Sequence, residues 1–108
     1  MQTRKVIIVV FTPVENADDI RKALGEAGAG KVGDYDFCSF SSRGIGRFRS
    51  SQDANPAIGK PGEYESVEEE RIEVVVERTI LQDVIRQVKA AHPYEEVPLY
   101  ALPLLDIS

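Results

Sequence analysis

The stretch Lys5-Val-Ile-Ile-Val-Val-Phe-Thr12 decides how the rest of the chain is arranged. It is almost continuously apolar and rich in β-branched residues, which is typical of a strand covered on at least one face. Pro13 ends the run, because proline has no N–H to donate to a strand ladder. We therefore predict a central strand near the N-terminus.

A first helix is predicted directly after this strand, over Glu15–Ala27. Asn16 is placed to act as its N-cap, and two aspartates follow in the first turn, where negative charge is favourable. The Gly28-Ala-Gly30 sequence ends the helix. The apolar residues recur at helical spacing: Ala17, Ile20, Leu24 and Ala27.

A second helix is predicted before Pro93. Thr79 and Gln82 have the spacing of a capping box, in which each side chain bonds a backbone N–H of the first turn. Proline ends the helix at its other terminus. One apolar face runs along it through Leu81, Val84, Ile85, Val88 and Ala91.

The region between the helices is predicted to be β-structure with one long loop. We interpret Tyr35–Ser42 as a second strand, Gly44-Ile-Gly46 as a turn or bulge, and Arg47–Arg49 as a third strand that returns in a hairpin. Ser50–Gly62 contains two prolines and two glycines and should be irregular. A loop of that length in a compact domain is functional, ordered by a partner, or mobile.

Two further strands complete the prediction. The stretch Tyr64–Glu77 begins acidic, and its second half, Arg71–Glu77, is a strong strand. Val97–Leu104 is the last strand, and Pro98 and Pro103 indicate that it lies at an edge of the sheet or is bulged.

The element order β-α-β-β-(β)-α-β predicts an α+β ferredoxin-like sandwich, with two helices on one face of an antiparallel sheet. The chain of 108 residues is expected to be a single domain, 1–108. The opposite sheet face then needs cover, and sheets with one bare face often oligomerise through it. We therefore expect a homo-oligomer.

Composition and charge limit the kinds of partner that we expect for this chain. The net charge is −5, and the basic residues are scattered apart from Arg43, Arg47 and Arg49, so we expect no nucleic-acid partner. The one cysteine, Cys38, cannot form an intrachain disulfide. No segment has the features of a signal peptide or a membrane helix. We expect a cytoplasmic protein without a membrane partner.

Two segments carry a resemblance to a known family: Gly44-Ile-Gly-Arg-Phe-Arg-Ser-Ser-Gln-Asp-Ala-Asn-Pro-Ala-Ile-Gly59 and Ala91-His-Pro-Tyr-Glu-Glu-Val97. Together they resemble the domain inserted in NIF-three-like (YqfO-like) proteins, which are labelled as cyclohydrolase-like. The resemblance implies a CutA/P-II-like fold and a trimer. It also places the family's dinuclear metal centre in the outer domains, and a chain with one histidine cannot supply that centre.

The His92-Pro-Tyr-Glu-Glu96 segment is the first candidate site. His92, Glu95 and Glu96 have side chains that can bind a divalent metal or serve as an acid/base pair. The alternative is structural: the histidine caps the preceding helix, the tyrosine packs, and the glutamates are solvated or pair with arginines.

The segment from Arg43 to Arg49 is the second candidate site. Its backbone N–H groups and guanidinium groups could cradle an anion, with Arg43, Gly44, Gly46, Arg47 and Arg49 as the binding residues. The alternative is a hairpin turn whose arginines pair with the acidic stretch between Glu63 and Glu77.

The remaining polar features have structural interpretations. Glu68-Glu-Glu70 is expected to be a solvated start to a strand, and Cys38 a buried, inert thiol within a strand. We assign no catalytic residue. The sequence predicts a non-catalytic module that binds a small ligand or a divalent metal and oligomerises. The alternative is a metal-dependent hydrolase or metal-handling protein that uses the His92–Glu96 segment.

Overall fold

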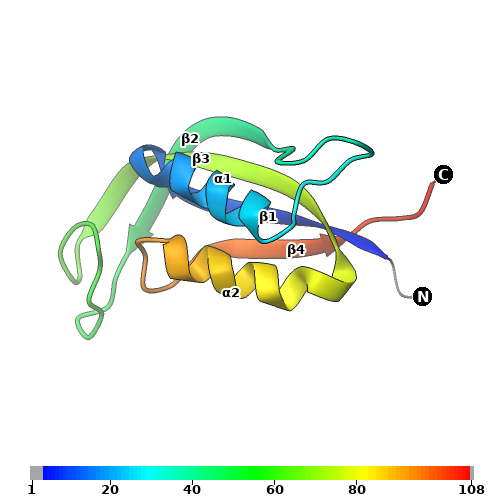
Figure 1. The fold of residues 1–108 in the computed structure, drawn as a ribbon. Helices are drawn as coiled ribbons and strands as arrows, with labels where there is room; N and C mark the ends of the chain where they lie inside the picture. Colours follow the sequence, from blue (N-terminus) through cyan, green and yellow to red (C-terminus); the bar gives the residue numbers. More distant parts are fainter. Residues whose placement is uncertain (1–3, 108) are drawn as a thin grey trace.

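The computed structural model describes residues 4–107 and has the predicted ferredoxin-like architecture. Its strands form one antiparallel sheet in the order β2-β3-β1-β4, and both helices lie on the same side of it (Figure 1). The elements are β1 (Lys5–Pro13), α1 (Ala17–Glu26), β2 (Phe40–Arg49), β3 (Tyr64–Glu77), α2 (Leu81–Ala91) and β4 (Leu99–Pro103).

The first strand is central, as its sequence predicts. β1 pairs with β3 along its whole length and with β4 from Val6 to Val10. β4 is an edge strand, as predicted, but it begins at Leu99, so that Pro98 precedes the strand and only Pro103 lies in it. None of the helices among residues 4–107 is long and apolar enough to cross a membrane.

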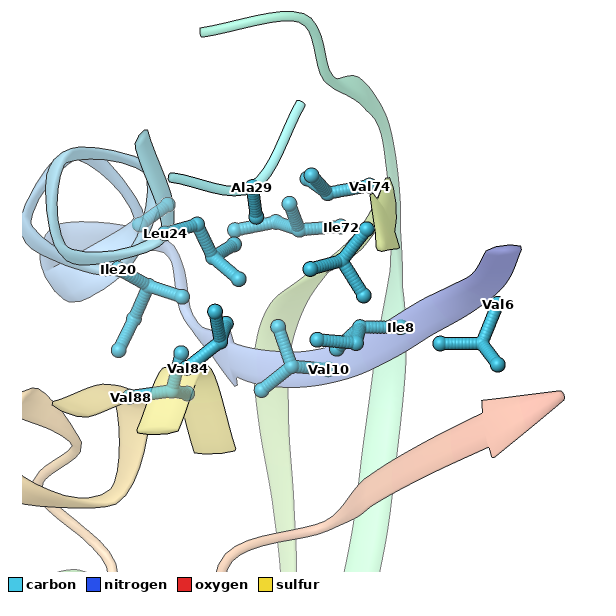
Figure 2. Packing of buried hydrophobic residues seen from close by; sticks show 12 residues of the cluster. Val6, Ile8, Val10, Ile20, Leu24, Ala29, Ile72, Val74, Val84 and Val88 are labelled. Atoms are coloured by element: carbon cyan, nitrogen blue, oxygen red, sulfur yellow. The ribbon is translucent and has the colours of Figure 1, made fainter. Parts of the chain in front are cut away.

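The hydrophobic core lies between the sheet and the two helices. Figure 2 shows Val84 and Val88 of α2 beside Ile8 and Val10 of β1, in the same cluster of buried side chains. The side chains contributed by α1 and β3 to the same cluster are Ile20, Leu24, Ile72 and Val74. Full burial of one such side chain contributes about 1.5–3 kcal/mol, so this cluster holds the helices on the sheet.

The predicted hairpin turn at Gly44-Ile-Gly46 is wrong. These residues lie inside β2, which runs unbroken from Phe40 to Arg49 and pairs with the whole first part of β3. There is no separate strand at Arg47–Arg49, and Tyr35 lies before the strand begins. Cys38 also lies outside the strand and is half-buried rather than buried.

The predicted side-chain caps do not form, although both helices are where the sequence places them. A short 3-10 turn precedes each helix, Val14–Asn16 before α1 and Arg78–Ile80 before α2. Thr79 therefore lies inside a turn, and neither it nor Asn16 makes a cap hydrogen bond. Gly28, with a φ of 102°, ends the first helix as predicted.

β2 and β3 continue past the end of β1 as a two-stranded arm. The last residue of β1, Pro13, pairs with Glu69, so the part of β3 from Tyr64 to Glu68 pairs with β2 alone. Residues 50–63 at the tip of this arm form neither helix nor strand, as predicted. In Figure 1 this loop, drawn in green, lies at the opposite end of the molecule from the two termini.

The Glu68–Glu70 stretch is only partly solvated. Glu68 is exposed, but Glu69 and Glu70 are buried, so the expectation of a solvated strand start is wrong for these two. They face opposite sides of a long strand that lies next to the central one. On the helix side, Glu70 forms an ion pair with Arg21 of α1 at 2.6 Å.

Candidate functional site

A groove of about 650 Å³ lies between the arm and the segment that connects α2 to β4. It unites parts of the two segments that the sequence analysis singled out, although they are about half the chain apart. Figure 1 shows the green loop and the orange connection at the same end of the molecule. Its lining includes charged and aromatic side chains and one glycine: Phe11, Gly46, Arg47, Phe48, Arg49, Glu69, Tyr94, Glu95, Glu96 and Tyr100.

His92 is the C-cap of α2 and fixes the start of this connection. Its Nε2 lies 2.7 Å from the carbonyl oxygen of Phe11, and its Nδ1 accepts the backbone N–H of Tyr94 at 3.1 Å. Because Nδ1 accepts, the proton of the neutral ring is on Nε2. Burial lowers the pKa of His92 and outweighs the opposing effects of the Phe11 carbonyl and the Glu69 charge.

Tyr94 links this connection to β3. Its hydroxyl lies 2.7 Å from Oε2 of Glu69 and donates to that carboxylate. Its ring packs against the rings of His92 and Phe48, at centroid distances of 4.9 and 6.3 Å. Burial raises the pKa of Tyr94, as does the Glu69 carboxylate, so the hydroxyl keeps its proton and remains a donor.

Gly46 makes room for the Glu69 carboxylate. A Cβ at position 46 would clash with Oε1 of Glu69, whereas a Cβ at position 44 would meet no atom within 4 Å. The two glycines of the Gly-Ile-Gly sequence therefore differ in role. The first stands in open space, and the second lets a buried carboxylate lie against the backbone of β2.

The predicted metal ligands are close in sequence but do not converge in space. Both ring nitrogens of His92 are engaged, and Glu95 accepts the backbone N–H of Asn55 at 3.1 Å, which ties the loop to the connection. Within residues 4–107, no three His, Cys, Asp or Glu side chains gather as a metal site. Divalent-metal binding by His92, Glu95 and Glu96 stays a prediction.

The predicted anion site is divided between two places. Arg43, Gly44 and Gly46 line a smaller hollow of about 250 Å³, and Arg47 and Arg49 line the groove. Neither glycine has a positive φ, and the turn that was expected to present N–H groups does not form. Anion binding through these residues stays a prediction.

The three arginines do not pair with the acidic stretch in the way the alternative interpretation expected. In the part of the chain that the structure describes, Arg43, Arg47 and Arg49 form no ion pair. Arg49 instead lies over the ring of Tyr64, its cross-strand neighbour, at 5.3 Å from the centroid.

Sequence reasoning missed the residue at the centre of the site. Glu69 was grouped with its acidic neighbours as a solvated side chain, yet it lines both the groove and the smaller hollow. The aromatic wall formed with Phe11, Phe48 and Tyr100 was missed as well. One signal was available: in a single strand from Tyr64 to Glu77, neighbouring glutamates must face opposite sides.

The chain is similar to one region of larger proteins. It is 45% identical over 95 residues to a GTP cyclohydrolase 1 type 2 homolog of Halalkalibacterium halodurans, and this match covers 88% of the chain and 25% of that protein. The homolog of Mycobacterium tuberculosis is 47% identical over 88 residues, covering 82% of the chain and 23% of that protein. The chain thus spans about a quarter of the length of these relatives. No family model matches it.

Solved structures agree with the sequence matches. The crystal structure of a Bacillus cereus protein related to NIF3 superposes with a TM-score of 0.80 at 40% identity, over 98% of this chain and 27% of that one. CutA1 from Shewanella sp. SIB1 superposes with a TM-score of 0.74 at 16% identity, over 100% of this chain and 88% of that one. The chain is therefore homologous to the inserted region of the GTP cyclohydrolase 1 type 2 homologs related to NIF3, and it has a CutA-like fold.

Proposed function

We propose that this chain is a non-catalytic domain that binds a small molecule in the groove and assembles into a homo-oligomer. The groove carries the proposal, because its volume of about 650 Å³ lies within the range of roughly 300–1,000 Å³ that is usual for small-molecule sites. Its lining also has the usual character of such sites. The walls are mainly apolar and aromatic, and a few polar groups, among them Tyr94 and Glu69, converge on them.

The hydrogen bonds of His92 argue against a catalytic role for this residue. The alternative, a metal-dependent hydrolase, would need His92 as a ligand or a base, but both of its ring nitrogens are already in hydrogen bonds within the fold. The relatives are about four times as long as the region that this chain matches, so their name describes proteins with further parts.

Assembly is proposed through the sheet face that carries no helix. Val6 and Ile8 of β1 face the core, so Ile7 faces the other way, and the register places Leu102 beside it on the same face. Tyr100 and Phe40 share this face by the same alternation. Their exposed fractions are 51% for Leu102, 57% for Tyr100 and 67% for Phe40. Exposed apolar clusters of this kind mark interaction sites.

A trimer is the favoured assembly. It is the form that the resemblance to CutA and P-II proteins implies, and the CutA-like fold of this chain supports it. Burying the open face would give the sheet a second covered side, which an apolar central strand such as β1 suits.

Ligand binding is tested with a fragment library screened by two-dimensional NMR on the isotope-labelled protein. The proposal expects hits whose shift changes map to residues around the groove, including Phe48, Tyr94 and Tyr100. A screen in which no fragment of any charge moves these resonances, or in which all hits map elsewhere, would contradict ligand binding in the groove.

A further inference from the structure

The charge distribution within the groove indicates what kind of molecule it takes. Of the charged side chains that line it, Arg47, Arg49, Glu95 and Glu96 are exposed to solvent. Glu69 is the buried one, with 9% of its surface exposed. Exposed charges are solvated by water and need no partner, whereas a buried carboxylate is costly unless it is paired.

Glu69 has one hydrogen-bond donor and no cation. Tyr94 donates to its Oε2, but a neutral hydroxyl leaves the negative charge in place. Arg43 and Arg71 line the adjacent hollow, but neither forms an ion pair with Glu69. The Nε of Arg71 pairs with Glu73 at 3.1 Å, and its guanidinium lies over the Phe11 ring. Within residues 4–107, Glu69 forms no ion pair. The buried charge therefore lacks its counter-ion.

Aromatic rings surround the same space. Phe11 and Tyr100 form an edge-to-face pair at 5.9 Å, Phe48 packs on Tyr94 at 6.3 Å, and all four rings line the groove. The faces of aromatic rings attract cations, and an apolar body gains from contact with their surface. A buried carboxylate among aromatic rings is the arrangement that recognises an organic ammonium ion.

We propose that the groove binds an organic cation, with a protonated amine on the Glu69 carboxylate and an apolar body against Phe11, Phe48, Tyr94 and Tyr100. This inference rests on the proposed ligand-binding function and specifies its ligand class.

Three probes of similar size and different charge test the proposal: 2-phenylethylamine, 2-phenylethanol and 3-phenylpropanoate. Each is titrated into the full chain, with calorimetry for affinity and two-dimensional NMR for location. Because a charge-assisted hydrogen bond to a buried carboxylate contributes more than a neutral one, the amine is expected to bind at least about tenfold tighter than the alcohol.

Glu69→Gln removes the charge and keeps an acceptor for the Tyr94 hydroxyl, so it should reduce amine affinity to that of the alcohol. Glu68→Gln is the matched control, because its side chain is exposed and does not line the groove, and it should leave amine affinity within about twofold. The comparison of probes on the unmodified chain needs no variant, so the test stands even if Glu69→Gln fails to fold.

The outcomes separate the two proposals. Equal affinity for the amine and the alcohol, or preferential binding of 3-phenylpropanoate in the groove, would overturn the assignment of an organic cation and leave the ligand-binding function intact. Binding of none of the three probes at the groove would overturn the organic cation, and a fragment screen that also finds no ligand there would overturn the ligand-binding function. Unchanged amine affinity in a folded Glu69→Gln variant would also overturn the role of this carboxylate.

Discussion

The hydroxyl of Tyr94 lies 2.7 Å from Oε2 of Glu69 and joins the connection after α2 to the middle of β3. This one hydrogen bond spans 25 positions of sequence and joins two residues that line the groove. It is also the hydrogen bond that the buried carboxylate of Glu69 accepts. The stability of the fold and the shape of the site therefore depend on the same pair of residues.

Tyr94→Phe should destabilise the chain, because it leaves a buried carboxylate without its donor. The expected loss in the free energy of unfolding is about 1–3 kcal/mol, measured by urea denaturation. Tyr64→Phe is the matched control, since Tyr64 is 81% exposed and loss of its hydroxyl should change stability by less than about 0.5 kcal/mol. Equal effects of the two substitutions would contradict the structural role of the Tyr94–Glu69 bond.

Gly46→Ala should be destabilising and Gly44→Ala should not. The new methyl group at position 46 would clash with the Glu69 carboxylate, whereas the one at position 44 would meet open space. The carboxylate is the flexible end of its side chain, but to move away it must leave the Tyr94 hydroxyl, so we expect a cost of about 1–3 kcal/mol. Thermal unfolding of both variants measures the difference. If the two variants unfold at the same temperature, the close approach of Glu69 to β2 is not present in solution.

The stability of the chain should fall as the pH is lowered through the range in which a free histidine titrates. The folded state lowers the pKa of His92, so the unfolded state binds its proton first as the pH falls below about 6.5. The neutral ring therefore stabilises the folded state fully above that pH. This stabilisation is lost as the pH falls toward the lower pKa that His92 has in the folded state. Protonation also removes the acceptor for the Tyr94 N–H.

His92 is the only histidine in the chain, so the effect can be isolated. Urea midpoints at pH 7.5 and 5.5 should differ more for the wild-type chain than for His92→Gln, in which this titration is absent. The Glu69 charge that acts on the ring and the Tyr94 ring that packs against it are kept in both proteins. An equal pH dependence in the two proteins would show that His92 does not titrate as the buried ring requires.

The positions of both helices, of β1 and of the edge strand β4 could be read from the sequence, but the course of β2 and the contacts between elements could not. The apolar run of β1 and the spacing of Ile20 and Leu24 are signals that depend on neighbouring residues alone. The interpretation of Gly44-Ile-Gly46 as a turn failed because the reason for Gly46 is a side chain 23 positions later in the chain. Glu69 was missed for the same reason, since its burial depends on Tyr94 and on the length of β3.

Leu102→Glu should weaken assembly. The side chain lies on the open face of the sheet, and a carboxylate there would lose hydration in any interface that covers the face. Ala90→Glu is the control, because it places the same charge at an exposed position of α2. Light scattering should give about three times the 12.0 kDa of one chain for the wild type and the control, and a smaller mass for Leu102→Glu. A wild-type chain that stays at 12.0 kDa at every concentration would contradict assembly.

A crystal structure of the chain grown with 2-phenylethylamine tests the central claim most directly. The proposal predicts the ligand in the groove, with its nitrogen about 2.7–3.0 Å from a carboxylate oxygen of Glu69 and its ring against Phe48 and Tyr94. It would be contradicted by a structure in which the amine lies elsewhere and a side chain of a neighbouring subunit fills the space beside Glu69.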